Sequence, residues 1–271
     1  MNIKDFFKTI YDRYIGWGEY QTDVLNVGNL PTRFGILSKE HIIMSTSLFL
    51  FMGLFTYFTR YYDSKRLEKA QKRISLTMLL LELLRIVWLR IYFPNEHFIR
   101  FDYCNQACLF FPILILCGLT IFYPAIMCIS FYGGLGVMLY PLWIFKSFGG
   151  FHIMSIQSMI SHGLMLLTSI NLARIHKTNF KKDIKISFIL FAIMAVLSFI
   201  FSMKRDANYM AMRTSVGVPI LEYISFPWHI PFVVGIIFLG LYVFILVKGK
   251  IDNKILTFDL KDNMEVEVNE L

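Results

Sequence analysis

Cys104 has the residue type and the neighbours of a catalytic nucleophile. It lies in the polar run RFDYCNQAC at 100–108, whereas Cys117 and Cys128 have apolar neighbours. A cysteine attacks as the thiolate, which needs a base or a positive field nearby. Cys104 is therefore the candidate nucleophile, although a cysteine in an apolar segment also serves as a small hydrophobic residue without chemistry.

A histidine in the apolar segment FHIMSIQSMISHGLMLLTSINLA at 151–173 is the candidate base. At helical spacing this segment has a polar stripe, with further polar residues beside it. The stripe consists of Ser155, Ser158, His162 and Ser169, and the residues beside it are Gln157, Ser161 and Thr168. An ionisable side chain in the middle of a membrane span usually faces the protein interior or a water-filled cavity. The other interpretation is that His162 only hydrogen-bonds a neighbouring helix.

Two further groups of polar residues are candidates for a polar cavity or a substrate site. Glu82 and Arg85 lie three residues apart on one helical face, where opposite charges can neutralise each other. Asn208 and Tyr209 follow the sixth apolar segment, and Trp228 precedes the seventh. Tyrosine and tryptophan at span ends are also ordinary interfacial anchors.

Composition and length indicate a polytopic membrane protein with an all-α fold. Of the 271 residues 56% are apolar and only 17% are charged, against about 25% charged in soluble domains. We expect about seven membrane-spanning helices, or six if the third and fourth merge; the expected spans are 41–59, 74–93, 101–118, 121–142, 151–173, 184–203 and 229–248.

The domain organisation is one helical bundle with two flanking segments. Residues 1–38 hold an amphipathic surface helix and a linker, 39–250 form the bundle, and 251–271 form an acidic polar tail expected to be partly disordered. The basic connectors 60–73 and 174–185 and the C-terminus share one side of the membrane. The excess of lysine and arginine predicts that this side is cytoplasmic and that the N-terminus is outside the cell membrane.

Several function classes are disfavoured by the sequence. The formal charge of +8 is spread over short connectors, which fits lipid headgroups better than nucleic acid. The four cysteines lack metal-ligand spacing, and we expect no metal and no cofactor. The sequence gives no oligomeric state.

Three pieces of the chain resemble the YwaF-like bacterial integral membrane proteins, which are related to animal transmembrane protein 164, an acyltransferase that remodels ether phospholipids. These pieces are Tyr103-Cys104, the run QSMISHG at 157–163, and ANYM at 207–210 followed by Pro227-Trp228. The resemblance extends from Glu40 to Lys250 and implies that Cys104 and His162 are a catalytic pair.

On this basis we expect a lipid acyltransferase or lipid hydrolase in which His162 deprotonates Cys104 and a thioester forms, with membrane phospholipids or lysophospholipids as partners. Asn208 or Gln157 would hydrogen-bond the oxyanion. The alternative is a transporter or ligand-binding protein whose polar core includes Glu82, Arg85, Gln157 and His162.

Along straight helices His162 lies about 16 Å deeper than the outer end of its span. If Cys104 is too far from it, Cys108, one turn deeper, is the substitute nucleophile.

Overall fold

All regular elements in the described part of the chain are helical, as the sequence predicts. The computed structural model describes residues 37–92, 99–141, 151–205 and 227–269, with side chains as far as 253 except that of residue 92. The elements are α2 (Lys39–Phe58), α3 (Ser64–Tyr92), α4 (Tyr103–Leu116), the 3-10 turn η3 (Thr120–Phe122), α5 (Tyr123–Leu139), α6 (Ile153–Ile175), α7 (Phe180–Lys204) and α8 (His229–Asn269). Each α-helix overlaps one of the seven predicted spans.

Five of these helices are long and apolar enough to cross a membrane, in α2, α5 with η3, α6, α7 and the first part of α8. Helix α4 has only 14 residues. Helix α3 has 29 residues but carries Glu82, Arg85 and Arg90 in its apolar half. The protein is thus a polytopic helical membrane protein, in which α3 and α4 depend on their neighbours for burial.

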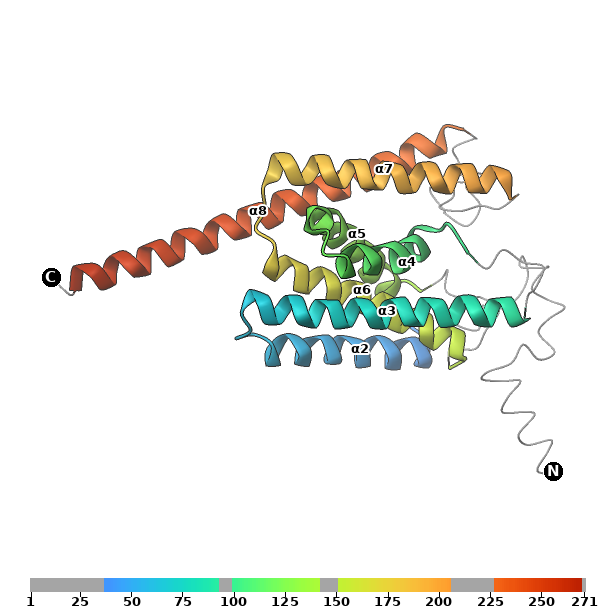
Figure 1. Cartoon of the computed structure of the whole chain (residues 1–271), viewed down its shortest axis with the longest axis horizontal. Coiled ribbons are helices and arrows are strands. Elements are labelled where there is room, and N and C mark those ends of the chain that lie inside the picture. The colour runs from blue at the N-terminus through green and yellow to red at the C-terminus, as the bar shows by residue number, and fades with distance from the viewer. Residues whose placement is uncertain (1–36, 93–98, 142–150, 206–226, 270–271) are drawn as a thin grey trace, which may run out of the picture.

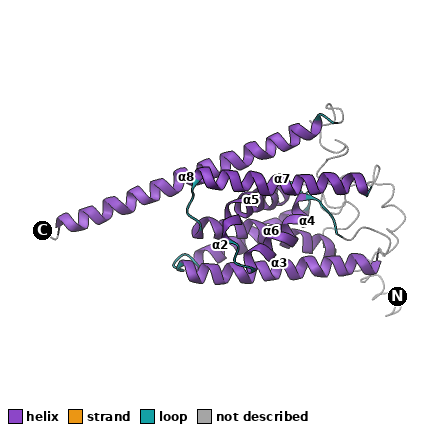
Figure 2. Cartoon of the chain, turned by 45° about the horizontal axis from the view of Figure 1, so that its top comes forward, coloured by secondary structure: helices purple, strands orange, loops and turns teal. Residues whose placement is uncertain are grey.

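Helix α6 is the centre of the bundle, because it contacts α2, α3, α4 and α5. Helices α7 and α8 pack against each other and against α5 (Figure 1, Figure 2). The fully buried side chains include Met159 and Met165 of α6 and Phe111 of α4. The helix that carries the predicted polar stripe therefore lies inside the protein, not on its lipid-facing surface.

The third and fourth spans do not merge. Helix α4 ends at Leu116 with Cys117 as its C-cap, and Gly118 follows with a φ of 71°. The amide of Leu119 donates to Leu114 O and that of Gly118 to Ile115 O, which is the Schellman pattern that closes a helix with a glycine. Pro124 then stands in the first turn of α5, where its missing N–H costs nothing.

The two basic connectors and the end of the chain lie at the same end of the bundle, as predicted (Figure 1). Which membrane side this end faces stays a prediction. Helix α8 continues beyond the expected span end at 248 to Asn269, so most of the acidic tail that was expected to be partly disordered is helical. No proline and no glycine follows Gly249 to stop the helix. The segment 1–38, predicted to hold a surface helix and a linker, lies outside the described residues except for 37 and 38.

Candidate functional site

The start of helix α4 is inset into the bundle because the preceding chain descends along helix α7. Arg205 at the end of α7 donates to Ile99 O, and Phe101 stacks on Phe201 with ring centroids 3.7 Å apart. The carbonyl of Phe101 accepts from Ser198, which lies seven residues, or about 10 Å, further into α7 than Arg205. The first turn of α4 therefore lies alongside Ser198, well inside the end of α7.

Residues on both sides of Cys104 are bonded to neighbouring helices. Tyr103 donates from its hydroxyl to Ile129 O of α5 at 3.2 Å. The Nε2 amide of Gln106 reaches Ser198 Oγ at 2.7 Å, Phe101 O at 2.9 Å and Met194 O at 3.1 Å. The first turn of α4 is thus fixed to α5 and α7 around the cysteine.

Cys104 lies in that first turn and is partly buried. Its Sγ is 3.6 Å from the place that a Cβ on Gly133 would occupy, and Met165 Cε is 2.7 Å from the same place. A Cβ on Gly134 would stand 2.7 Å from His162 O. The two adjacent glycines of α5 therefore allow the helices of Cys104 and of His162 to approach it closely.

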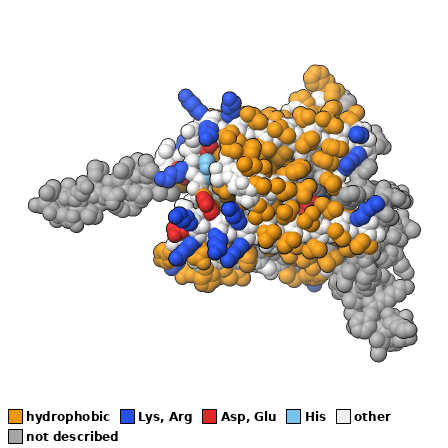
Figure 3. Space-filling model, in the orientation of Figure 1, with side chains coloured by type: hydrophobic (Ala, Val, Ile, Leu, Met, Phe, Trp, Pro, Cys, Tyr) orange, Lys and Arg blue, Asp and Glu red, His pale blue; other side chains and the backbone are white. Residues whose placement is uncertain are grey.

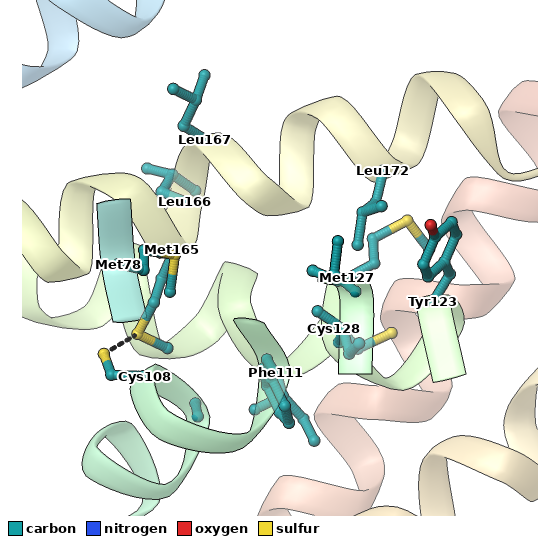
Figure 4. Close-up of a cluster of buried hydrophobic side chains, with 14 of the residues drawn as sticks. Met78, Cys108, Phe111, Tyr123, Met127, Cys128, Met165, Leu166, Leu167 and Leu172 are labelled. Carbon is teal, nitrogen blue, oxygen red and sulfur yellow. Dashed lines mark hydrogen bonds between the residues drawn. The ribbon is translucent and has the colours of Figure 1, made fainter. Parts of the chain in front are cut away.

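A sulfur contact shows how deep helix α4 reaches alongside α6. Cys108 Sγ lies 3.6 Å from Met165 Sδ (Figure 4). Cys104 is one turn before Cys108, and His162 is about one turn before Met165, on a neighbouring face. Both helices begin at the same end of the bundle, so the turns that carry Cys104 and His162 lie at similar depth. The expected depth mismatch is absent because α4 begins deeper than α6.

His162 is 8% exposed and uses one ring nitrogen within its own helix. Nδ1 lies 2.7 Å from Ser158 O. Because a carbonyl only accepts, Nδ1 must carry the hydrogen, which leaves Nε2 with its lone pair. Nε2 is buried and has no hydrogen-bond partner among the described residues. No hydrogen bond joins Cys104 to His162 in the described part of the protein, but the tautomer is that of a general base.

A comparison with protein families gives one family whose model matches most of the chain. The model of the TMEM164 family matches residues 36–247. The chain belongs to the TMEM164 family. No curated protein and no solved structure matches it. The matched region contains α2 to α7 and most of the membrane part of α8, so both Cys104 and His162 lie in the family's domain.

In this member of the TMEM164 family Gln157 faces helix α3. Its Nε2 amide donates to Leu81 O at 3.4 Å and to Ser161 Oγ at 3.1 Å. Its Oε1 is buried and has no partner among the described residues. The amide hydrogens are engaged with α3 and α6, so Gln157 is poorly placed to donate to an oxyanion beside Cys104.

Glu82 and Arg85 pair with each other inside α3. Arg85 donates from Nε to Glu82 Oε2 at 2.9 Å and from Nη2 to Oε1, and both side chains are 4% exposed. The predicted mutual neutralisation is therefore present, on a helix that packs against α4.

The remaining predicted site residues are not near this centre or are not described. Trp228 is 71% exposed, as expected of an interfacial anchor. Asn208 and Tyr209 lie outside the described residues.

Sequence reasoning missed the glycine pair Gly133-Gly134 and the bond between Gln106 and Ser198. A doublet of glycines within an apolar span is a signal of close helix approach that could have been used. The Gln106 to Ser198 bond joins residues 92 positions apart and has no local signal.

Proposed function

We propose that this TMEM164 family member is a lipid acyltransferase or lipid hydrolase that uses Cys104 as nucleophile and His162 as base. The observation that carries the proposal is the state of His162. Its Nδ1 hydrogen is held by Ser158 O, and its buried Nε2 lone pair is unused by any described residue. A buried acceptor without a partner costs stability, and in this proposal the proton of Cys104 satisfies it.

The proposed chemistry has two steps. His162 Nε2 takes the proton of Cys104, and the thiolate attacks the ester carbonyl of a membrane lipid; the ester C–O bond breaks, and the departing oxygen takes the proton from the imidazolium. In the second step His162 deprotonates the hydroxyl of a lysolipid or of water. This oxygen attacks the thioester, the C–S bond breaks, and Cys104 recovers its proton.

The first turn of α4 supplies groups that favour both the thiolate and the oxyanion. Cys104 is the second residue of the helix, near the positive end of its dipole. The N-cap residue Asp102 makes no capping bond, because its carboxylate pairs with Arg100 and accepts from Asn105. The backbone N–H groups of Cys104 and Asn105 are therefore better oxyanion donors than the side chain of Gln157.

The experiment is covalent labelling of the full-length protein in lipid nanodiscs with a long-chain lipid-like electrophile. Cys117 is exposed and would react without activation, so all variants carry Cys117→Ser. We expect labelling at Cys104 that is abolished in Cys104→Ser and reduced at least about tenfold in His162→Ala. This is a cautious threshold, because a general base typically contributes about a hundredfold or more to the rate. Cys108→Ser is the matched control and should label normally.

A second readout is the acyl thioester formed with a phospholipid, detected as a mass increase on the peptide that contains Cys104. Equal labelling in His162→Ala would contradict the role of His162 as base. Labelling at Cys108 instead of Cys104 would move the nucleophile one turn deeper. Absence of any labelling above that of Cys128 would contradict the enzyme proposal.

The alternative function is binding or transport of a small solute in the polar core. It is supported by two buried acceptors of α6 that no described residue satisfies, Gln157 Oε1 and His162 Nε2. A transporter should keep its activity in Cys104→Ser but lose it in Gln157→Leu, whereas the enzyme should show the opposite sensitivity.

A further inference from the structure

Exposed cations gather at one end of the bundle and form a surface that we name the basic rim. Figure 3 shows them beside the apolar surface, at the end where α8 leaves the bundle. Its members are Arg60, Lys65, Arg66, Lys69, Lys72, Arg73, Lys177, Lys181, Lys182, Lys185 and Lys250. The exposed acidic residues among them are Asp63 and Glu68, so the rim is strongly positive.

On helix α3 the rim passes directly into a lipid-facing surface. Lys65, Lys69 and Lys72 are exposed, while Leu67 and Gln71 between them are buried. From one turn beyond Lys72 the exposed side of α3 is mainly aliphatic, apart from Thr77 and Arg90; its aliphatic residues are Leu76, Leu80, Leu83, Leu84, Val87 and Ile91. The same outer surface therefore changes from cations to hydrocarbon within about one turn, or 5 Å.

Helix α7 repeats this change at the same end of the bundle. Lys181, Lys182 and Lys185 are exposed in its first two turns. One turn after Lys185 the exposed residues become apolar, and they are Ile189, Ile193, Val196, Phe199, Ile200 and Met203. Two helices that are far apart in sequence thus place lysines immediately beside the hydrocarbon boundary.

Two other acidic groups near the rim, Asp183 and Asp252, are occupied by hydrogen-bond partners outside the rim. Asp183 accepts from His176 Nε2 and from the amide of Asn179. Asp252 accepts from Lys248 and Thr178. Lys65 of α3 and Lys181 and Lys182 of α7 also stand in the first turn of their helices, where the helix dipole adds to their positive charge instead of offsetting it.

Aromatic side chains place the rim at the level of lipid headgroups. Arg60 lies over the rings of Tyr57 and Tyr61, at 4.0 and 4.6 Å from their centroids. Tyr57, Tyr61 and Tyr62 are exposed, and exposed tyrosines beside an apolar surface are typical of the membrane interface.

We propose that the basic rim binds the phosphate groups of anionic lipids in the leaflet that surrounds it. The immediate continuity with the apolar surface favours a lipid, because a soluble acidic protein or a nucleic acid would approach from the aqueous side alone. Lysines beside the boundary lie within reach of the headgroup phosphates of lipids whose chains cover Leu76 or Ile189. This surface is separate from the Cys104 and His162 centre, and the inference does not rest on the function proposed for it.

The test is native mass spectrometry of the full-length protein released from nanodiscs with equal amounts of phosphatidylcholine and phosphatidylglycerol. The rim variant is Lys72→Gln with Lys185→Gln. The matched control is Lys39→Gln with Lys204→Gln. These two exposed lysines, at the start of α2 and the end of α7, lie at the end of the bundle away from the rim. None of these four side chains makes a described hydrogen bond, so the variants should fold alike.

We expect wild type and control to retain more phosphatidylglycerol than phosphatidylcholine. In the rim variant the ratio of bound phosphatidylglycerol to bound phosphatidylcholine should fall about tenfold. Raising the salt concentration should weaken the preference in the wild type more than in the rim variant. An equal loss in control and rim variant, or no preference in the wild type, would overturn the proposal. Salt-sensitive binding of a labelled RNA or acidic peptide without any lipid preference would also overturn it.

Discussion

The Sγ atom of Cys104 lies 3.6 Å from the position of a Cβ on Gly133, and the next residue, Gly134, meets the backbone of His162 in the same way at 2.7 Å. One glycine pair of α5 thus faces the helix of Cys104 and the helix of His162. Its neighbour Gly136 has open space around its Cβ position. These three glycines make a graded test of how tightly the centre is packed.

We predict that alanine substitution destabilises the protein in the order Gly134, then Gly133, with Gly136 neutral or slightly stabilised. At Gly134 the added methyl group meets backbone atoms of His162 and Leu166, which cannot move independently. The cost should be about 1–3 kcal/mol or more. At Gly133 the close atom is the end of the Met165 side chain, which can rotate away. Thermal unfolding of the purified protein in detergent measures this order, and a Gly136→Ala that is the least stable would contradict it.

The hydrogen bonds of Gln106 should keep Cys104 in place. Gln106→Leu removes one of the two side-chain donors to Phe101 O and one of the two to Met194 O, the other donor in each case being Ser198, at a cost of about 1–3 kcal/mol for the two bonds together. Ser198→Ala should cost less, because Gln106 still reaches both carbonyls. We expect the alkylation rate of Cys104 to rise more in Gln106→Leu than in Ser198→Ala. Equal rates in both variants and wild type would mean that these bonds do not hold the first turn of α4.

Local patterns in the sequence indicate the candidate residues, whereas the relative depth of Cys104 and His162 depends on contacts between segments far apart in the sequence. The polar stripe of His162 and the spacing of Glu82 and Arg85 follow helical periodicity, which is readable within one segment. The inset start of α4 is not readable, since it depends on Ile99 and Phe101 running along α7. The helical continuation of α8 to Asn269 was not predicted, because the acidic polar composition of the tail favours disorder, although no proline or glycine after Gly249 interrupts the helix.

The buried ion pair of α3 should show an asymmetric response to mutation. Glu82→Gln leaves the guanidinium of Arg85 buried without its carboxylate and should cost about 3–5 kcal/mol. Arg85→Gln should cost less, because an isolated buried carboxyl group can take up a proton, whereas arginine cannot lose one. The double variant Glu82→Leu with Arg85→Leu should be more stable than Glu82→Gln alone. Denaturant titration in mixed micelles gives these values, and a Glu82→Gln variant as stable as wild type would refute the argument.

A polar contact at the basic end joins α8 to the connector between α6 and α7. Both oxygens of Asp252 accept from Lys248 Nζ, and Oδ2 also accepts from the amide and the hydroxyl of Thr178, at 3.0 and 2.7 Å. Lys248 Nζ donates as well to His176 O at 3.2 Å. Asp252 thus links Lys248 of α8 to the backbone amide of Thr178 in the connector.

We predict that Asp252→Ala loosens this end of α8 without unfolding the bundle. Charge-assisted hydrogen bonds of this kind contribute about 1.5–3 kcal/mol each before the solvent screening that applies to a carboxylate 25% exposed. Hydrogen exchange should therefore become faster at 176–180 and 248–252, while exchange in the central turns of α6 stays unchanged. Lys250→Ala is the matched control, because Lys250 is exposed two positions away and makes no described bond. If Lys250→Ala accelerates exchange as much as Asp252→Ala, the contact with Thr178 does not hold α8 to the connector.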